Sequence, residues 1–188
     1  MIEVSDETIE KLHTVLARVE NARGKVLKPA FGRALQAGKT EAKRKAVETY
    51  HIKPGEYKKN TYIQYQSEEH GEDEIIGTIS FAGNPIPLIK YNVSPKTPSR
   101  KTPSAVVKKA NSPVKFDRKK DVFVQQMGSG HIGIFKREDT GKIKELYGPS
   151  TPKITENEEV IQAVTDKVNE VLNRRIEHEI ERLFNSEG

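Results

Sequence analysis

The sequence predicts an α+β fold with N-terminal helices, a central and mostly antiparallel β-sheet or small open barrel, and a long C-terminal helix. Apolar residues recur with helical spacing near both ends of the chain, whereas β-branched and aromatic residues gather in short runs in the middle. No helical segment separates these runs, which favours antiparallel pairing over helical crossovers. We expect residues 1–52 to be helical, 53–150 to form a β domain with a Pro/Lys-rich arm at about 92–120, and 151–188 to form the last helix.

Two helices are expected in the first region. The first begins at Ser5, whose hydroxyl can cap a helix N-terminus, and Gly24 is its expected end. The second runs from about Pro29 to the turn at 53–55, where proline and glycine disfavour continuation. Small residues on its apolar face, including Gly38, would allow a neighbouring element to approach closely.

Six strands are expected in the central region, with Asn84-Pro85 as a turn between two of them. Residues 67–74 carry five carboxylates and predict a solvated hairpin tip. Binding of a divalent cation there is the alternative, although the spacing of a calcium loop is missing. The expected strands are residues 61–66, 74–81, 86–91, 105–108, 121–127 and 132–136.

The last region predicts one helix from about Glu156 to Phe184. At about 1.5 Å per residue it would extend roughly 40 Å, so its apolar face needs a long partner. The N-terminal helices and β domain are one candidate partner, and a neighbouring subunit is the other. The expected stripe consists of Val160, Ile161, Val164, Val168, Val171, Leu172, Ile176, Ile180, Leu183 and Phe184.

Composition narrows the class of protein. The chain has 188 residues, a net charge of +5 and no cysteine, so disulfides and thiolate metal sites are excluded. No apolar run approaches the roughly 18 residues of a membrane span, and the acidic N-terminus lacks a signal-peptide pattern. We expect a soluble protein of one domain with helical extensions, without a cofactor, a metal or a membrane contact.

Charge is distributed unevenly along the chain. Residues 23–45 carry a local +7, residues 96–120 a local +8, and the chain from 156 onward a local −5. Lysine and arginine attract phosphates without reading base sequence, so the 96–120 block could contact DNA, contact acidic neighbours, or remain a solvated arm. The candidate contact residues are Lys96, Arg100, Lys101, Lys108, Lys109, Lys115, Arg118, Lys119 and Lys120.

The sequence Ser129-Gly130-His131 predicts a tight turn between two strands. Ser129 and His131 could instead form a catalytic pair, but the sequence offers no evident acid to orient the histidine and no strand-to-helix elbow. A metal at His131 is also disfavoured, because the histidines lack ligand spacing. The expected turn residues, including a second turn toward the last helix, are Gly128, Gly130, Gly133, Gly148 and Pro149.

Three segments together resemble the phage minor tail protein Z family in order and spacing. They are residues 83–91 (GNPIPLIKY), 123–137 (FVQQMGSGHIGIFKR) and 143–152 (IKELYGPSTP). The resemblance covers residues from about 27 to 175. The chain departs from the family in being richer in lysine and glutamate, and in the longer or more basic arm.

The resemblance implies a structural virion protein rather than an enzyme, acting in tail completion or head–tail joining at the head-proximal end of a phage tail. It implies assembly in the host cytoplasm, with other tail or neck proteins and further copies of the chain as partners. A ring on the six-fold tail axis would be a hexamer. Contact with packaged DNA stays open, and the family offers no residues of known chemistry.

Two other hypotheses belong to different classes of protein. The first is a free nucleic-acid-binding accessory protein that uses the basic blocks 23–45 and 96–120, and it predicts steeply salt-dependent DNA binding. The second is a hydrolase that uses Ser129 and His131, and it predicts turnover that His131→Ala abolishes.

Overall fold

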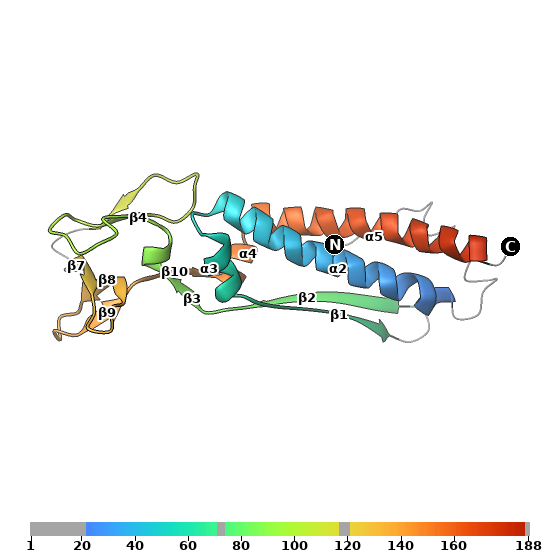
Figure 1. The fold of residues 1–188 in the computed structure, drawn as a ribbon, viewed down its shortest axis with the longest axis horizontal. Coiled ribbons are helices and arrows are strands. Elements are labelled where there is room, and N and C mark those ends of the chain that lie inside the picture. Colours follow the sequence, from blue (N-terminus) through green and yellow to red (C-terminus); the bar gives the residue numbers. More distant parts are fainter. Residues whose placement is uncertain (1–21, 71–73, 117–120, 187–188) are drawn as a thin grey trace. The chain divides into compact units, whose positions relative to one another are not determined.

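The computed structural model describes residues 22–70, 74–116 and 121–186, and it has the expected α+β class (Figure 1). The chain divides into two compact units. The expected boundaries at 52 and 150 do not coincide with this division, because the hairpin at 63–80 belongs with the helices. Among the described residues, unit 1 takes 22–42, 63–70, 74–80 and 158–186, and unit 2 takes 43–62, 81–116 and 121–157.

Helix α2, Ala22–Thr49, begins earlier than expected. The expected break at Gly24 is wrong, because this residue lies inside the helix. Pro29 also lies inside it, where the missing N–H removes one backbone hydrogen bond. Val26 and Ala30 are both fully buried, so packing stabilises the helix on either side of the proline. The helix expected from Ser5 falls outside the described residues.

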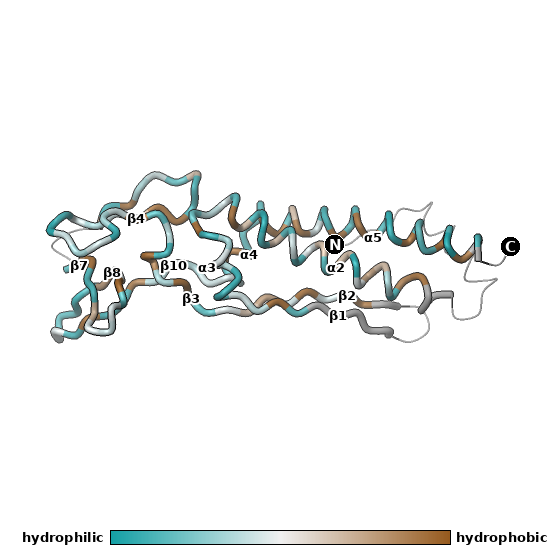
Figure 2. The backbone as a smooth tube through the Cα atoms, in the orientation of Figure 1, coloured by the Kyte–Doolittle hydropathy of each residue, from teal (hydrophilic) through white to brown (hydrophobic). Residues whose placement is uncertain are grey.

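Helix α5, Glu158–Ser186, confirms the long C-terminal helix. Its apolar stripe is buried as expected, except that Ile161 is 50% exposed and the side chain of Phe184 is outside the description. In unit 1 the helices α2 and α5 lie side by side and run in opposite directions (Figure 1). Apolar and polar positions alternate along both helices (Figure 2). Within the described residues, no helix combines the length and apolarity needed to cross a bilayer.

Gly38 is where α2, α5 and strand β2 approach most closely. A methyl group there would lie 2.5 Å from Val168 Cγ2 and 2.9 Å from Ile79 Cδ1. Strands β1, Tyr62–His70, and β2, Glu74–Ala82, form a two-stranded sheet. The ring of Phe31 occupies the space beside Gly77 of β2, so α2 packs between this sheet and α5. The small residues of α2 therefore allow the close approach that the sequence predicted.

Unit 2 confirms the expected antiparallel β structure, which is divided into several small sheets. The strand orders are β10-β3, β4-β5-β6 and β7-β8-β9, and every pair with a defined register among them is antiparallel. Its elements are α3 Pro54–Lys59, β3 Pro85–Pro87, the 3-10 helix η1 Leu88–Lys90, β4 Asn92–Ser94, β5 Ser104–Val106, β6 Val114–Lys115, β7 Val122–Gln126, β8 Ile132–Arg137, β9 Ile143–Glu145, β10 Tyr147–Ser150 and α4 Thr151–Thr155.

The described part of the Pro/Lys-rich arm is packed and is not a wholly solvated arm. Its residues form the β4-β5-β6 sheet, in which Val93, Ala105 and Val106 are buried. The backbone N–H of His51 donates to the Val107 carbonyl at 2.9 Å, which ties the segment to the chain after α2. Residues 117–120 fall outside the described part.

Candidate assembly surface

The three motif segments meet inside unit 2. The N–H of Leu146 donates to the carbonyl of Ile134 at 2.7 Å, and the Leu146 carbonyl accepts from the N–H of Leu88 at 2.9 Å. Tyr147 of β10 is paired with Pro87 of β3. Leu146 therefore joins the second and first segments, and the residues of all three motifs form one structural core.

Tyr91 adds a side-chain link between the first and third segments. Its hydroxyl donates to the carbonyl of Pro149 at 3.0 Å. A methyl group on Gly148 would lie 2.5 Å from Tyr91 Cε2, so the ring needs a glycine beneath it. Burial, followed by the nearby Tyr50, raises the pKa of Tyr91 above its usual range. Gly148 and Pro149 lie in strand β10, which is followed directly by α4, so the turn expected at these two residues is wrong.

The turn between β7 and β8 has the expected geometry at one glycine. The Gly130 N–H donates to the Met127 carbonyl at 2.8 Å, and Gly130 has a φ of +83° that favours glycine. Gly128 is not among the residues with positive φ, and no described atom would contact a methyl group on it within 4 Å. Gly133 lies within β8, so its assignment to the turn is wrong.

Gly133 matters because it makes room for a polar cluster. His131 Nε2 lies 2.8 Å from Glu145 Oε1, and the Tyr147 hydroxyl donates to Glu145 Oε2 at 3.1 Å. The sequence had offered no evident acid for His131, and the structure supplies Glu145 from strand β9. The hydrogen bond to Glu145 raises the pKa of Tyr147. The side chain of Tyr147 is 52% exposed.

The chemistry of this cluster is that of a hydrogen bond between His131 and Glu145 near the surface, with Tyr147 bonded to the same carboxyl group. Ser129 is exposed at the hairpin tip, and among the described residues it shares no side-chain hydrogen bond with His131. The described residues also contain no group of three or more potential metal-binding side chains. The cluster therefore orients His131 and Tyr147 at the surface without a nucleophile bonded to the histidine.

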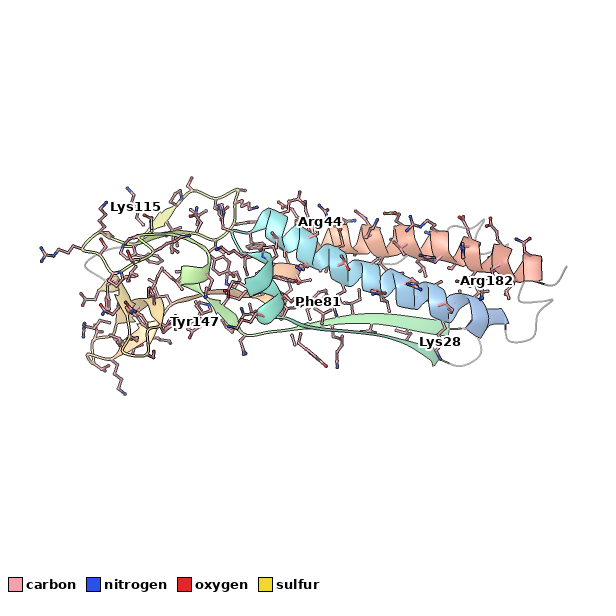
Figure 3. All side chains as sticks on the ribbon, viewed as in Figure 1. Lys28, Arg44, Phe81, Lys115, Tyr147 and Arg182 are labelled. Carbon is pink, nitrogen blue, oxygen red and sulfur yellow. The ribbon has the colours of Figure 1, made fainter. Side chains whose placement is uncertain are left out.

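Most of the described basic residues of the 96–120 block lie on the surface of unit 2. Lys108 is half-buried, and its backbone pairs with Tyr50. Arg118, Lys119 and Lys120 fall outside the described residues. The exposed ones are Lys96, Arg100, Lys101, Lys109 and Lys115, the last of which is labelled in Figure 3. We call these five residues the basic surface.

The first basic block, 23–45, is carried by α2 and is partly neutralised near its C-terminal end. Glu48 lies 2.8 Å from Arg44 Nη1 and 3.5 Å from Lys45 Nζ. The acidic stretch 67–74 includes the ends of β1 and β2, but residues 71–73 and the neighbouring side chains fall outside the description. The solvated tip expected there, and the alternative of a cation site, fall on this part of the chain and stay predictions.

Comparison with protein-family models, curated proteins and solved structures finds no match to this chain. The resemblance to the phage minor tail protein Z family therefore rests on the three motif segments alone.

Proposed function

We propose that this chain is a structural virion protein that acts in tail completion or head–tail joining at the head-proximal end of a phage tail. It acts by protein–protein assembly, with neighbouring tail or neck proteins and further copies of itself as partners. A closed ring is the arrangement by which identical subunits satisfy their interfaces on a tail axis.

The observation that carries the proposal is the mutual packing of the three motif segments. The residues that carry the family resemblance form hydrogen bonds with one another. Leu146 bonds to Ile134 and Leu88, and Tyr91 bonds to Pro149. Motifs whose residues bond to one another stabilise the fold and therefore the surfaces of the protein. This is expected of a protein that acts through the shape and charge of its surfaces. The basic surface is then available to a negatively charged neighbour.

Genetic complementation tests the proposal. The gene is interrupted in the parent phage, and lysates are examined by electron microscopy after supply of the wild-type chain or a variant. In lysates without the chain, we expect either full heads and finished tails that remain unjoined, or joined particles that fail to inject DNA. Lys101→Glu/Lys115→Glu should leave the defect in place, because it reverses two charges of the basic surface.

The matched control is Lys58→Glu/Lys59→Glu, which makes the same charge change on exposed lysines of α3 in unit 2. This variant should restore infectious particles. Normal particles from the interrupted phage would refute the joining role, and equal defects in the two variants would refute the role of the basic surface.

A free DNA-binding accessory protein is the second candidate, and the five exposed cations of the basic surface favour it. It predicts that the purified chain binds duplex DNA tightly without other virion parts. The logarithm of the binding constant would fall by about 0.9 per neutralised phosphate for each tenfold rise in salt. Weak binding with a shallow slope would remove this candidate.

A further inference from the structure

Unit 1 contains a groove between α2 and α5 that the proposed function does not use. Its volume is about 360 Å³. Helix α2 supplies residues at positions 33, 36, 37, 40 and 41, and α5 supplies 167, 171, 174 and 175. Within each set the residues recur three or four positions apart, as they do on one helix face, so two rows of side chains line the groove.

Three arginines line this groove. Arg33 is exposed, and the described residues give it no ion pair or hydrogen bond. Arg175 is half-buried, and its Nε is buried without a hydrogen-bond partner. Within the described part of the chain, Arg174 has a single ion-pair contact, at a long 3.8 Å, with Glu170. A buried guanidinium N–H without an acceptor is unfavourable. Because Arg175 lines the groove, an oxyanion bound there would accept hydrogen bonds from its guanidinium group.

The remaining lining favours a peptide over a nucleic acid. Ala37 and Val171 give the groove apolar surface, which suits the methylene groups of a side chain. Glu41 is also part of the lining, and Glu170 pairs with Lys167 at 2.7 Å beside it. These carboxylates would repel a continuous phosphate backbone, whereas a peptide can place single carboxylates beside the arginines.

We propose that the α2/α5 groove binds an acidic peptide segment of a partner protein, with Arg33 and Arg175 binding its carboxylates. From residue 33 to residue 41 the α2 part of the groove advances by eight residue steps, or about 12 Å, which matches roughly four residues of extended peptide. Gln36 and Thr40 lie between the charged positions and add polar groups for the peptide backbone. This site does not depend on the proposed tail role.

Fluorescence anisotropy with a labelled hexaglutamate peptide tests the site in the full-length protein. Arg33→Gln/Arg175→Gln should weaken binding about tenfold or more, because two charge-assisted contacts are lost. Thr40→Glu, which adds a carboxylate on an exposed helix position of the groove, should also weaken binding. If circular dichroism shows that the double variant is unfolded, Thr40→Glu still tests the proposal.

The matched control is Lys28→Gln/Arg182→Gln, which makes the same charge change on exposed positions of α2 and α5 outside the groove lining (Figure 3). Its peptide affinity should stay within about twofold of wild type. No peptide binding by the wild-type chain, or an equal loss in control and groove variants, would overturn the proposal. The proposal would also be overturned if duplex DNA bound more tightly than the peptide and this binding were lost in the variant without the groove arginines.

Discussion

Glycines serve two different purposes in the motif segments of unit 2. Gly130 is needed for its backbone conformation, because a side chain at φ +83° is strained. Gly133 is needed for space, since a methyl group there would lie 2.6 Å from Glu145 Oε1 and 2.9 Å from Phe135 Cζ. The first requirement is local to the turn, and the second comes from strand β9 and the ring of Phe135.

Gly133→Ala should therefore displace Glu145 and break its contact with His131. We expect the free energy of unfolding to fall by about 1–3 kcal/mol, as in other overpacked sites. Chemical denaturation measures the stability, and the NMR signals of the His131 ring report the contact. Gly128→Ala, with open space around it, should change stability by less than about 1 kcal/mol. Equal losses in the two variants would contradict the spatial argument.

The contact of His131 with Glu145 could not be predicted from the sequence. It depends on β9, a three-residue strand whose residues Ile143 and Lys144 are exposed and therefore give no buried alternating pattern. One usable signal was present. Gly141, at φ +80°, donates its N–H to the Glu138 carbonyl, which repeats the arrangement of Gly130 and Met127. A turn at Gly141 would have indicated a strand after it.

At the scale of elements, the small residues of helix α2 determine how closely its neighbours pack against it. The hydrophobic pattern predicted both long helices, because buried residues such as Leu35 and Leu172 recur with helical period. The start of the second helix was less predictable, because Gly24 and Pro29 disfavour a helix only locally. Burial of Val26 and Ala30 outweighs that preference, and such burial comes from residues distant in the sequence.

Two alanine substitutions in α2 should have opposite effects. Gly38→Ala places a methyl group against Val168 and Ile79, whereas Gly32→Ala meets no described atom within 4 Å. Gly32→Ala should stabilise the protein by up to about 1 kcal/mol through helix propensity. Gly38→Ala gains the same propensity but forces α5 or β2 to move, so it should be less stable than Gly32→Ala by about 2 kcal/mol. Thermal and urea unfolding measure both, and equal stabilities would show that the three elements separate easily.

In the β4-β5-β6 sheet only β5 overlaps an expected strand, 105–108, because the strands are two or three residues long and prolines surround them. Ala105 at its centre is paired with Val93 and Val114. Ala105→Asp should lower the free energy of unfolding by about 3 kcal/mol, because it buries a charge without a partner. Ala110→Asp, an exposed position of the same segment, should cost less than about 0.5 kcal/mol. Similar denaturation midpoints would mean that the sheet is not formed in solution.

For the whole molecule, each unit is assembled from segments that are separated in the sequence. The hairpin β1–β2 lay where strands were expected, but its membership of unit 1 depends on the contact of Phe31 with Gly77, which lie far apart in the chain. Sequence patterns assign an element and its apolar face, and they do not say which distant face will cover it. The expected division into three consecutive regions failed for this reason.

The alkaline limit of stability should be set in unit 2, where burial raises the pKa of both Tyr57 and Tyr91. Below pH 10 both hydroxyls are protonated in the folded and unfolded chains, so their contribution is constant. Above pH 10 the unfolded chain loses these protons first, which stabilises the unfolded state. The free energy of unfolding should therefore fall by up to about 1.4 kcal/mol per pH unit for each tyrosine.

Urea unfolding at pH 9, 10 and 11 measures this decline. Tyr57→Phe/Tyr91→Phe loses the hydrogen bond to Pro149 and should be less stable at pH 9 by about 1 kcal/mol. Its stability should nevertheless fall less steeply above pH 10, because neither phenylalanine can ionise. Tyr62→Phe, at an exposed position of unit 2, should keep the wild-type slope. If the double variant declined as steeply as the wild type, the two buried hydroxyls would not set the alkaline limit.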